Sequence, residues 1–138
     1  MKRRILIVED EAKVHERLAR CLDANVFDAV WTQTAHESLR RSLDERFDLV
    51  LLDLNVSDMD GWKALDWFNK LHPFLPVVVL ANRPDQVQRA TALGADACLE
   101  KPVDAPRLSD TVHQLLAESH SARMTRLTEP RYGLANVH

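Results

Sequence analysis

The sequence predicts an α/β protein in which a parallel sheet carries helices on both of its faces. Short apolar runs rich in β-branched residues occupy 5–8, 49–52 and 77–80, and each is typical of a strand buried on both sides. Two weaker strands are expected at 26–33 and 97–99. A segment of helical period follows each of the five strands, and this alternation favours right-handed crossovers.

The helices are indicated by apolar residues that recur every three or four positions. Helices are expected over 11–24 and 61–71, after Thr34, around 87–93 and over the segment containing 108–116. Thr34 and Glu37 have the spacing of a capping box at a helix start. Gly94 fits a left-handed cap at a helix end.

Composition indicates a soluble globular protein. The chain has 138 residues, of which 46% are hydrophobic and 28% charged, with a net charge of −3. This balance does not favour binding to nucleic acid or to an anionic membrane. No apolar stretch approaches the roughly 20 residues of a membrane span, and the run at 5–8 is too short for a signal peptide. A cytoplasmic protein with free thiols at Cys21 and Cys98 is therefore expected.

The strand–helix alternation predicts one domain over residues 1–118. Residues 119–138 carry arginines but no clear apolar period. We expect a helix extension there, followed by a tail or linker, and a solvated terminus is the default for such a segment.

Acidic side chains follow two of the predicted strands. Glu9 and Asp10 end the first strand, Asp53 ends the third, and Lys101 follows the fifth. In an open parallel sheet these strand ends meet at one edge. Carboxylates that converge need a cation, and Mg²⁺ prefers one or two carboxylates with several waters. A metal and a lysine beside one aspartate suit phosphoryl transfer, with Asp53 as the acceptor. Taken singly, each acid could instead be an ordinary solvated strand-end residue.

Three segments, in this order, resemble the receiver domain of bacterial two-component response regulators. They are "ILIVEDE", "DLVLLDLNVSDMDG" and "GADACLEKPVD". The resemblance covers roughly residues 3–118. It implies a flavodoxin-like doubly wound (βα)5 fold with a five-stranded parallel sheet in the order 2-1-3-4-5.

The resemblance also implies roles for single residues. Asp53 would accept a phosphoryl group from a histidine kinase, a phosphotransfer protein or a small phosphodonor. Asp10, Asp53 and the backbone carbonyl of Asn55 would bind Mg²⁺, with Glu9 acting mainly through water. Lys101 would contact a phosphoryl oxygen, and its bond to Pro102 would be cis. Such a domain is not an enzyme beyond its own phosphorylation and dephosphorylation.

Three positions depart from the family pattern. Ala81 replaces the usual threonine or serine at the end of the fourth strand, Cys98 replaces an aromatic residue, and Ser57 replaces a loop proline. The common hydroxyl-and-ring switch therefore looks absent. Asn82 and Arg83, on the same loop as Ala81, are candidates to supply donors instead.

Other functions remain as alternatives. An aspartate-nucleophile phosphatase would need a second acid where Asn55 stands, and a flavin module would not carry acids in its first loop. A phosphorylation-independent interaction domain stays open because of Ala81 and Cys98. The resemblance allows a homodimer through the last two helices, and residues 1–118 are not expected to contact nucleic acid or membrane.

Overall fold

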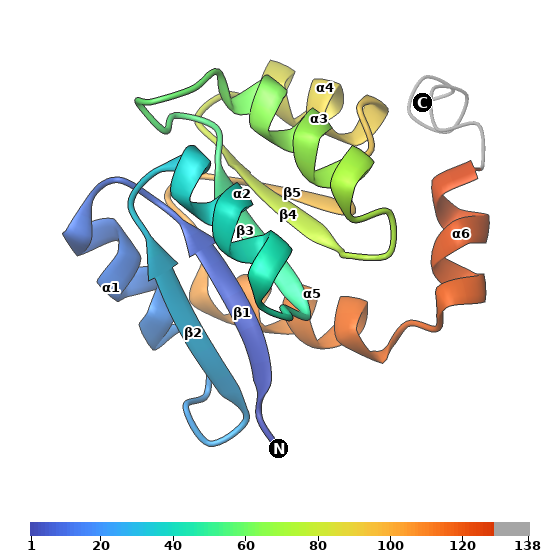
Figure 1. Ribbon diagram of the computed structural model, residues 1–138, viewed down its shortest axis with the longest axis horizontal. Coiled ribbons are helices and arrows are strands. Elements are labelled where there is room, and N and C mark those ends of the chain that lie inside the picture. The colour runs from blue at the N-terminus through green and yellow to red at the C-terminus, as the bar shows by residue number, and fades with distance from the viewer. Residues whose placement is uncertain (129–138) are drawn as a thin grey trace.

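A computed structural model describes residues 1–128 of the chain (Figure 1). All five strands are parallel and lie in the order β2-β1-β3-β4-β5, so the predicted fold class is confirmed. The strands are β1 (Arg3–Val8), β2 (Phe27–Thr32), β3 (Leu49–Asp53), β4 (Val77–Ala81) and β5 (Ala97–Glu100). Strand order reverses beside β1, which leaves β1 and β3 at the centre of the sheet.

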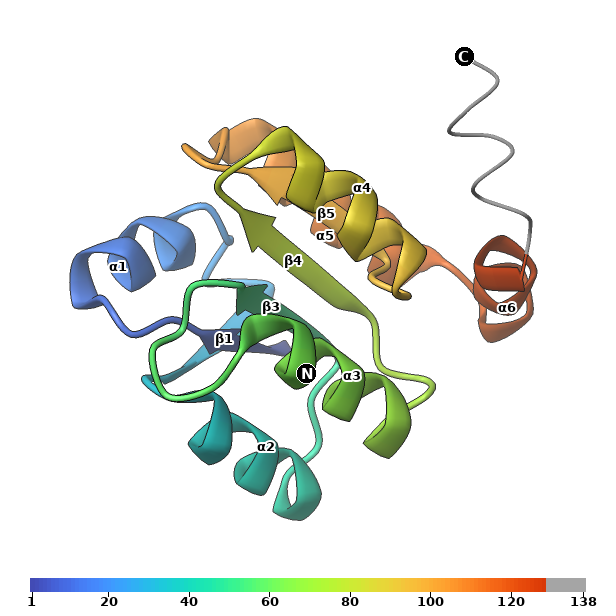
Figure 2. The same ribbon diagram turned by 90° about the horizontal axis from the view of Figure 1, so that it is seen from above.

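Helices cover both faces of the sheet (Figure 2). The covering helices are α1 (Ala12–Arg20), α2 (Ala35–Asp44), α3 (Gly61–Leu71), α4 (Pro84–Ala92) and α5 (Ala105–Ala117). A sixth helix, α6 (His120–Thr128), contributes no residue to either core. Alternate residues of each central strand point to opposite faces. Leu6, Val50 and Val79 therefore join one apolar core, against α2, α3 and α4. Ile7, Leu51 and Leu80 join the other, against α1 and α5.

The helix ends agree in part with the sequence predictions. Thr34 accepts a hydrogen bond from the Glu37 N–H and caps α2. Gly94 has φ of 97°, so it lies in the left-handed region that favours glycine. The first helix ends at Arg20 rather than at residue 24. Its predicted length is wrong because Asp23 accepts hydrogen bonds from the backbone of residues 25–27, which form a turn into β2.

The helix α6 is separate from α5 rather than an extension of it. Glu118 has an extended backbone, with φ of −73° and ψ of 134°, and this turns the chain between the two helices. Most residues of α6 are exposed, as expected for a solvated terminus, but Arg123 is only 5% exposed and is therefore an exception. The predicted tail from residue 129 onward lies outside the described residues. No helix within residues 1–128 is long and apolar enough to cross a bilayer.

Candidate functional site: an acidic pair and a lysine at the carboxyl edge

The structure brings Glu9, Asp53 and Lys101 together at the carboxyl edge of the sheet. Asp53 is the last residue of β3 and is 2% exposed, while Glu9 directly follows β1 and is 1% exposed. Lys101 follows β5, and its Nζ lies 2.5 Å from Asp53 Oδ2. The other oxygen, Asp53 Oδ1, accepts a hydrogen bond of 2.9 Å from the Asn55 N–H. Three chain segments distant in sequence thus supply one charged cluster.

The two buried carboxyl groups have opposite tendencies to ionise. Burial raises the pKa of Glu9 to about 8, helped by a hydrogen bond with Asp53 and by the Asp53 charge. Burial would also raise the pKa of Asp53. Hydrogen bonds with Glu9, Lys101 and the Asn55 N–H outweigh it and lower that pKa overall. Of the two carboxyl groups, Asp53 is therefore the one whose surroundings favour the charged form.

The residues at this edge fit a Mg²⁺ ion. Glu9 Oε1 is buried and has no hydrogen-bond partner in the described chain, which marks an incompletely satisfied site. The Asp10 side chain, in the same turn, forms no hydrogen bond or ion pair with any residue of 1–128. No three His, Cys, Asp or Glu side chains in that range form a closed metal cluster. Mg²⁺ does not require one, because it keeps several waters.

The loop after Asp53 is shaped by two aspartates that lie outside this cluster. Asp58 accepts hydrogen bonds from the N–H groups of Ala35 and His36, and so caps α2 from another segment. Asp60 caps α3 by accepting from the Trp62 N–H. A Cβ on Gly61 would lie 2.2 Å from the Leu54 carbonyl oxygen, so only glycine allows this close return of the loop. These residues hold the loop that follows Asp53.

The atypical switch positions and their candidate substitutes lie on β4, on β5 and on the loop that follows β4. Ala81 is fully buried at the end of β4, and its carbonyl accepts a hydrogen bond from the Lys101 N–H. Cys98 is 9% exposed, and burial raises the pKa of its thiol to about 11. Asn82 and Arg83 are exposed, and the Arg83 guanidinium pairs with Asp85 at 3.0 Å. The peptide bond between Lys101 and Pro102 is cis.

One contact at this edge was not foreseen from the sequence. The indole Nε1 of Trp31 donates a 2.7 Å hydrogen bond to the backbone carbonyl of Glu9. No motif or spacing in the sequence assigns a role to Trp31. The sole sequence signal for such a bond is an aromatic residue with a polar atom close to the end of a strand. That signal does not identify the acceptor.

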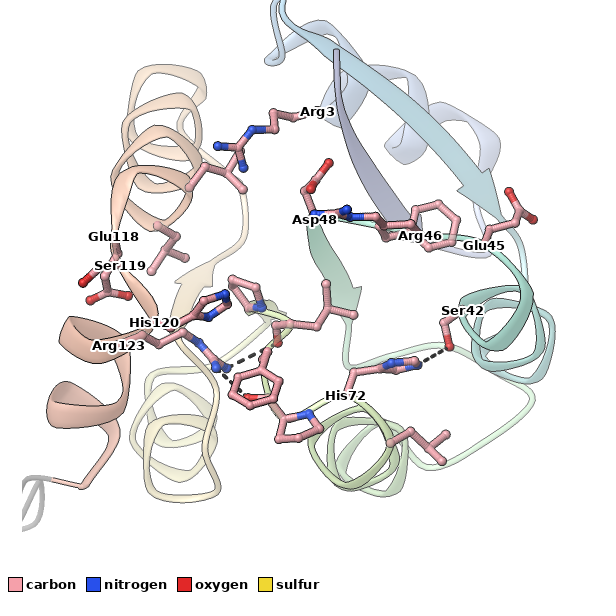
Figure 3. A pocket seen from close by; sticks show the side chains of 18 residues that line it. Arg3, Ser42, Glu45, Arg46, Asp48, His72, Glu118, Ser119, His120 and Arg123 are labelled. Atoms are coloured by element: carbon pink, nitrogen blue, oxygen red, sulfur yellow. Dashed lines mark hydrogen bonds between the residues drawn. The ribbon is translucent and has the colours of Figure 1, made fainter. Parts of the chain in front are cut away.

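Two cavities stand out among the described residues, and the larger lies away from the acidic cluster, at the opposite edge of the sheet (Figure 3). Its volume is about 640 Å³, and it opens between the α5–α6 corner and the loops that precede β3 and β4. On its wall, Arg123 donates to the carbonyls of Pro73 and Leu75 and pairs with Asp96 at 2.7 Å. Arg126 also pairs with Asp96, at 2.8 Å.

Comparison with known proteins identifies the family. The family model of the response regulator receiver domain matches residues 5–113. The chain belongs to the response regulator receiver domain family. It is 34% identical over 126 residues to the transcriptional activator protein IrlR of Burkholderia pseudomallei, covering 90% of this chain and 55% of that protein. Against the transcriptional regulatory protein GlrR of Escherichia coli it is 31% identical over 128 residues, covering 91% of this chain and 29% of GlrR.

Solved receiver domains have the same architecture. The receiver domain of NtrX from Brucella abortus is 30% identical and superimposes with a TM-score of 0.78, covering 83% of this chain and 99% of that one. A CheY-like receiver domain protein from Methanospirillum hungatei is 27% identical with a TM-score of 0.77, covering 85% and 95%. This receiver thus spans only about half of IrlR and less than a third of GlrR.

Proposed function

We propose that this receiver accepts a phosphoryl group on Asp53 in a Mg²⁺-dependent reaction. The observation that supports it best is the buried Asp53 side chain, whose Oδ2 lies 2.5 Å from Lys101 Nζ at the carboxyl edge of the sheet, next to the buried Glu9. A carboxylate in this position can act as a nucleophile, while neighbouring cations neutralise the incoming group.

In the proposed reaction an Asp53 oxygen attacks the phosphorus of a phosphohistidine on a sensor histidine kinase or a phosphotransfer protein. The new O–P bond forms as the N–P bond of the donor breaks. The electron pair of the broken N–P bond stays on the imidazole nitrogen. Mg²⁺, held by Asp10, Asp53 and the Asn55 carbonyl with Glu9 acting through water, would neutralise phosphoryl charge. Lys101, which pairs with Asp53 before transfer, would then bind a phosphoryl oxygen.

Acetyl phosphate tests the proposal directly. Intact-mass measurement after incubation with acetyl phosphate and Mg²⁺ should show one added phosphate, and Asp53→Asn should abolish it. Asp66→Asn serves as the matched control, because Asp66 lies exposed on α3, where it pairs with Lys70. If neither acetyl phosphate nor a cognate kinase produces an adduct under conditions that preserve acyl phosphates, the proposal is wrong.

The common receiver switch uses a hydroxyl group on the fourth strand and an aromatic ring on the fifth. This chain has neither, so signalling would use other groups. Ala81 has only a methyl group to offer, and Cys98 has no ring to move. We assign the response to Arg83, with Asn82 as the second candidate. Moving Arg83 toward a phosphate breaks only an exposed ion pair with Asp85, and such surface pairs contribute little to stability. Arg83→Ala should then reduce the backbone NMR shifts that beryllofluoride induces in α4 and α5. Undiminished shifts would rule Arg83 out.

Ala81 and Cys98 also support a second candidate function. A receiver whose switch is lost could act as an interaction domain without phosphorylation, including as a homodimer through α4 and α5. The acetyl phosphate experiment distinguishes the two, because only the phosphoacceptor gains mass at Asp53. Sedimentation of the protein with and without beryllofluoride would test the dimer.

A further inference from the structure

The backbone of Glu9 is held on both sides although the strand before it has ended. Its N–H donates to the Thr32 carbonyl of β2 at 3.1 Å, which continues the sheet by one residue. Its carbonyl accepts from the side chain of Trp31, at 2.7 Å. This carbonyl belongs to the peptide unit that joins Glu9 to Asp10. The indole therefore fixes the orientation of the peptide from which both acidic side chains project.

Trp31 is itself held in place by two elements. It lies on β2, paired in register with Ile7 of β1, and its side chain is partly buried. The ring of His15, from α1, stacks on the indole with centroids 4.7 Å apart and planes 13° apart. The indole thus bridges β2 and α1 across the turn that carries Glu9 and Asp10. A tryptophan confined in this way loses little further freedom when it forms its hydrogen bond.

We propose that Trp31 is a positioning residue for the acidic turn and thereby for Mg²⁺ at the carboxyl edge. Mg²⁺ demands near-ideal octahedral geometry, so an unsteady peptide between two acids weakens its binding. The inference rests on the proposed function, because it deepens the same site. Trp31 would touch neither the metal nor the phosphoryl group, and it acts through the backbone of Glu9.

Trp31→Phe tests the role of the N–H, since phenylalanine keeps a ring against His15 but has no donor. The dissociation constant for Mg²⁺, measured by calorimetry, should rise about fivefold, as expected for one lost hydrogen bond. The half-saturating Mg²⁺ concentration for acetyl phosphate labelling should rise equally, with the rate at saturating Mg²⁺ within about twofold of wild type. The matched control is Trp67→Phe on α3, where the residue is 47% exposed, and neither quantity should change.

NMR on the unmodified protein provides an independent readout. The chain has three tryptophans, and the two phenylalanine variants assign two of the three indole N–H signals. The Trp31 signal should shift as Mg²⁺ is added, with the same midpoint as the calorimetric binding. The Trp67 signal should stay in place. His15→Ala, which keeps the donor but removes the stacked ring, should weaken Mg²⁺ binding in the same direction and by less.

The outcomes separate this inference from the function on which it rests. If wild type binds Mg²⁺ and is labelled while Trp31→Phe matches it and the Trp31 signal is still, the positioning role is overturned and the function stands. If wild type neither binds Mg²⁺ nor takes phosphate, the proposed function fails and the positioning role fails with it. If Trp31→Phe does not fold, the wild-type indole shift and His15→Ala decide.

Discussion

The molecule holds two clusters of charge at opposite edges of one sheet, and they differ in how completely they are satisfied. At the amino edge, Asp96 is fully buried in its side chain, and its carboxylate accepts from the Val77 N–H and from Arg123 and Arg126. At the carboxyl edge, Lys101 pairs with Asp53, and Glu9 Oε1 is left without a partner in the described chain. A satisfied cluster stabilises a fold, whereas an unsatisfied one can accept a ligand.

The comparison also explains where α6 sits. Arg123 is buried, and besides Asp96 it satisfies two carbonyls at the loop before β4. The amino edge thus uses its charges to attach the last described helix to the body of the receiver. The carboxyl edge instead leaves a buried carboxylate oxygen, Glu9 Oε1, without a partner in the described chain. Both clusters bury charged groups and combine residues distant in sequence. Burial of charge alone therefore does not distinguish a ligand-binding site from a structural ion-pair cluster.

The largest effect is expected from removing Asp96. Asp96→Ala leaves Arg123 without its counter-ion, and breaking a buried ion pair costs about 3 kcal/mol or more. Urea unfolding should show that loss in the free energy of unfolding. Asp66→Ala, which breaks an exposed pair on α3, should cost about 0.5 kcal/mol or less. Equal losses of unfolding free energy in the two variants would show that the Asp96 cluster stabilises the fold no more than an exposed ion pair does.

An intermediate effect is expected from the metal. Mg²⁺ at about ten times its dissociation constant should raise the free energy of unfolding by about 1.4 kcal/mol, because it binds only the folded site. Chelation should remove this increment, and Glu9→Gln should reduce it. Arg123→Ala should keep the increment despite its lower stability, since distant sites act additively. Loss of the Mg²⁺ increment in Arg123→Ala would mean that the two edges are coupled.

The smallest effect is expected at His72, on the wall of the larger cavity. Its Nε2 lies 2.8 Å from the Ser42 hydroxyl, and burial lowers its pKa from 6.5. Below pH 6.5 the unfolded chain therefore takes up a proton that the folded chain does not. Stability is lost as pH falls through the folded pKa.

His72→Gln should flatten this part of the pH dependence, measured as thermal midpoints between pH 7.5 and pH 5 at about half-unit steps. The difference from wild type isolates His72, because His15, whose pKa burial also lowers, is present in both proteins. A curve for His72→Gln parallel to that of wild type would contradict the assignment.

The sequence by itself determined the fold class and the acidic site. Strand and helix periods follow from side-chain alternation along one segment, and parallel strand ends must meet at one edge. Hence Glu9, Asp53 and Lys101 could be placed together before any coordinates. Gly94 could also be assigned to a helix cap from the sequence, because the freedom of glycine to adopt a left-handed backbone is a local property.

Only the tertiary structure decided which polar groups find each other across the chain. The bond from Trp31 to the Glu9 carbonyl depends on the register of β2 and on a ring from α1. The docking of α6 depends on Asp96, 27 residues before Arg123. Such pairings leave no periodic trace in the sequence, because they arise from side-chain directions after the layers have packed. These pairings decide how residues 119–128 pack and which side chain contacts the backbone of the acidic turn.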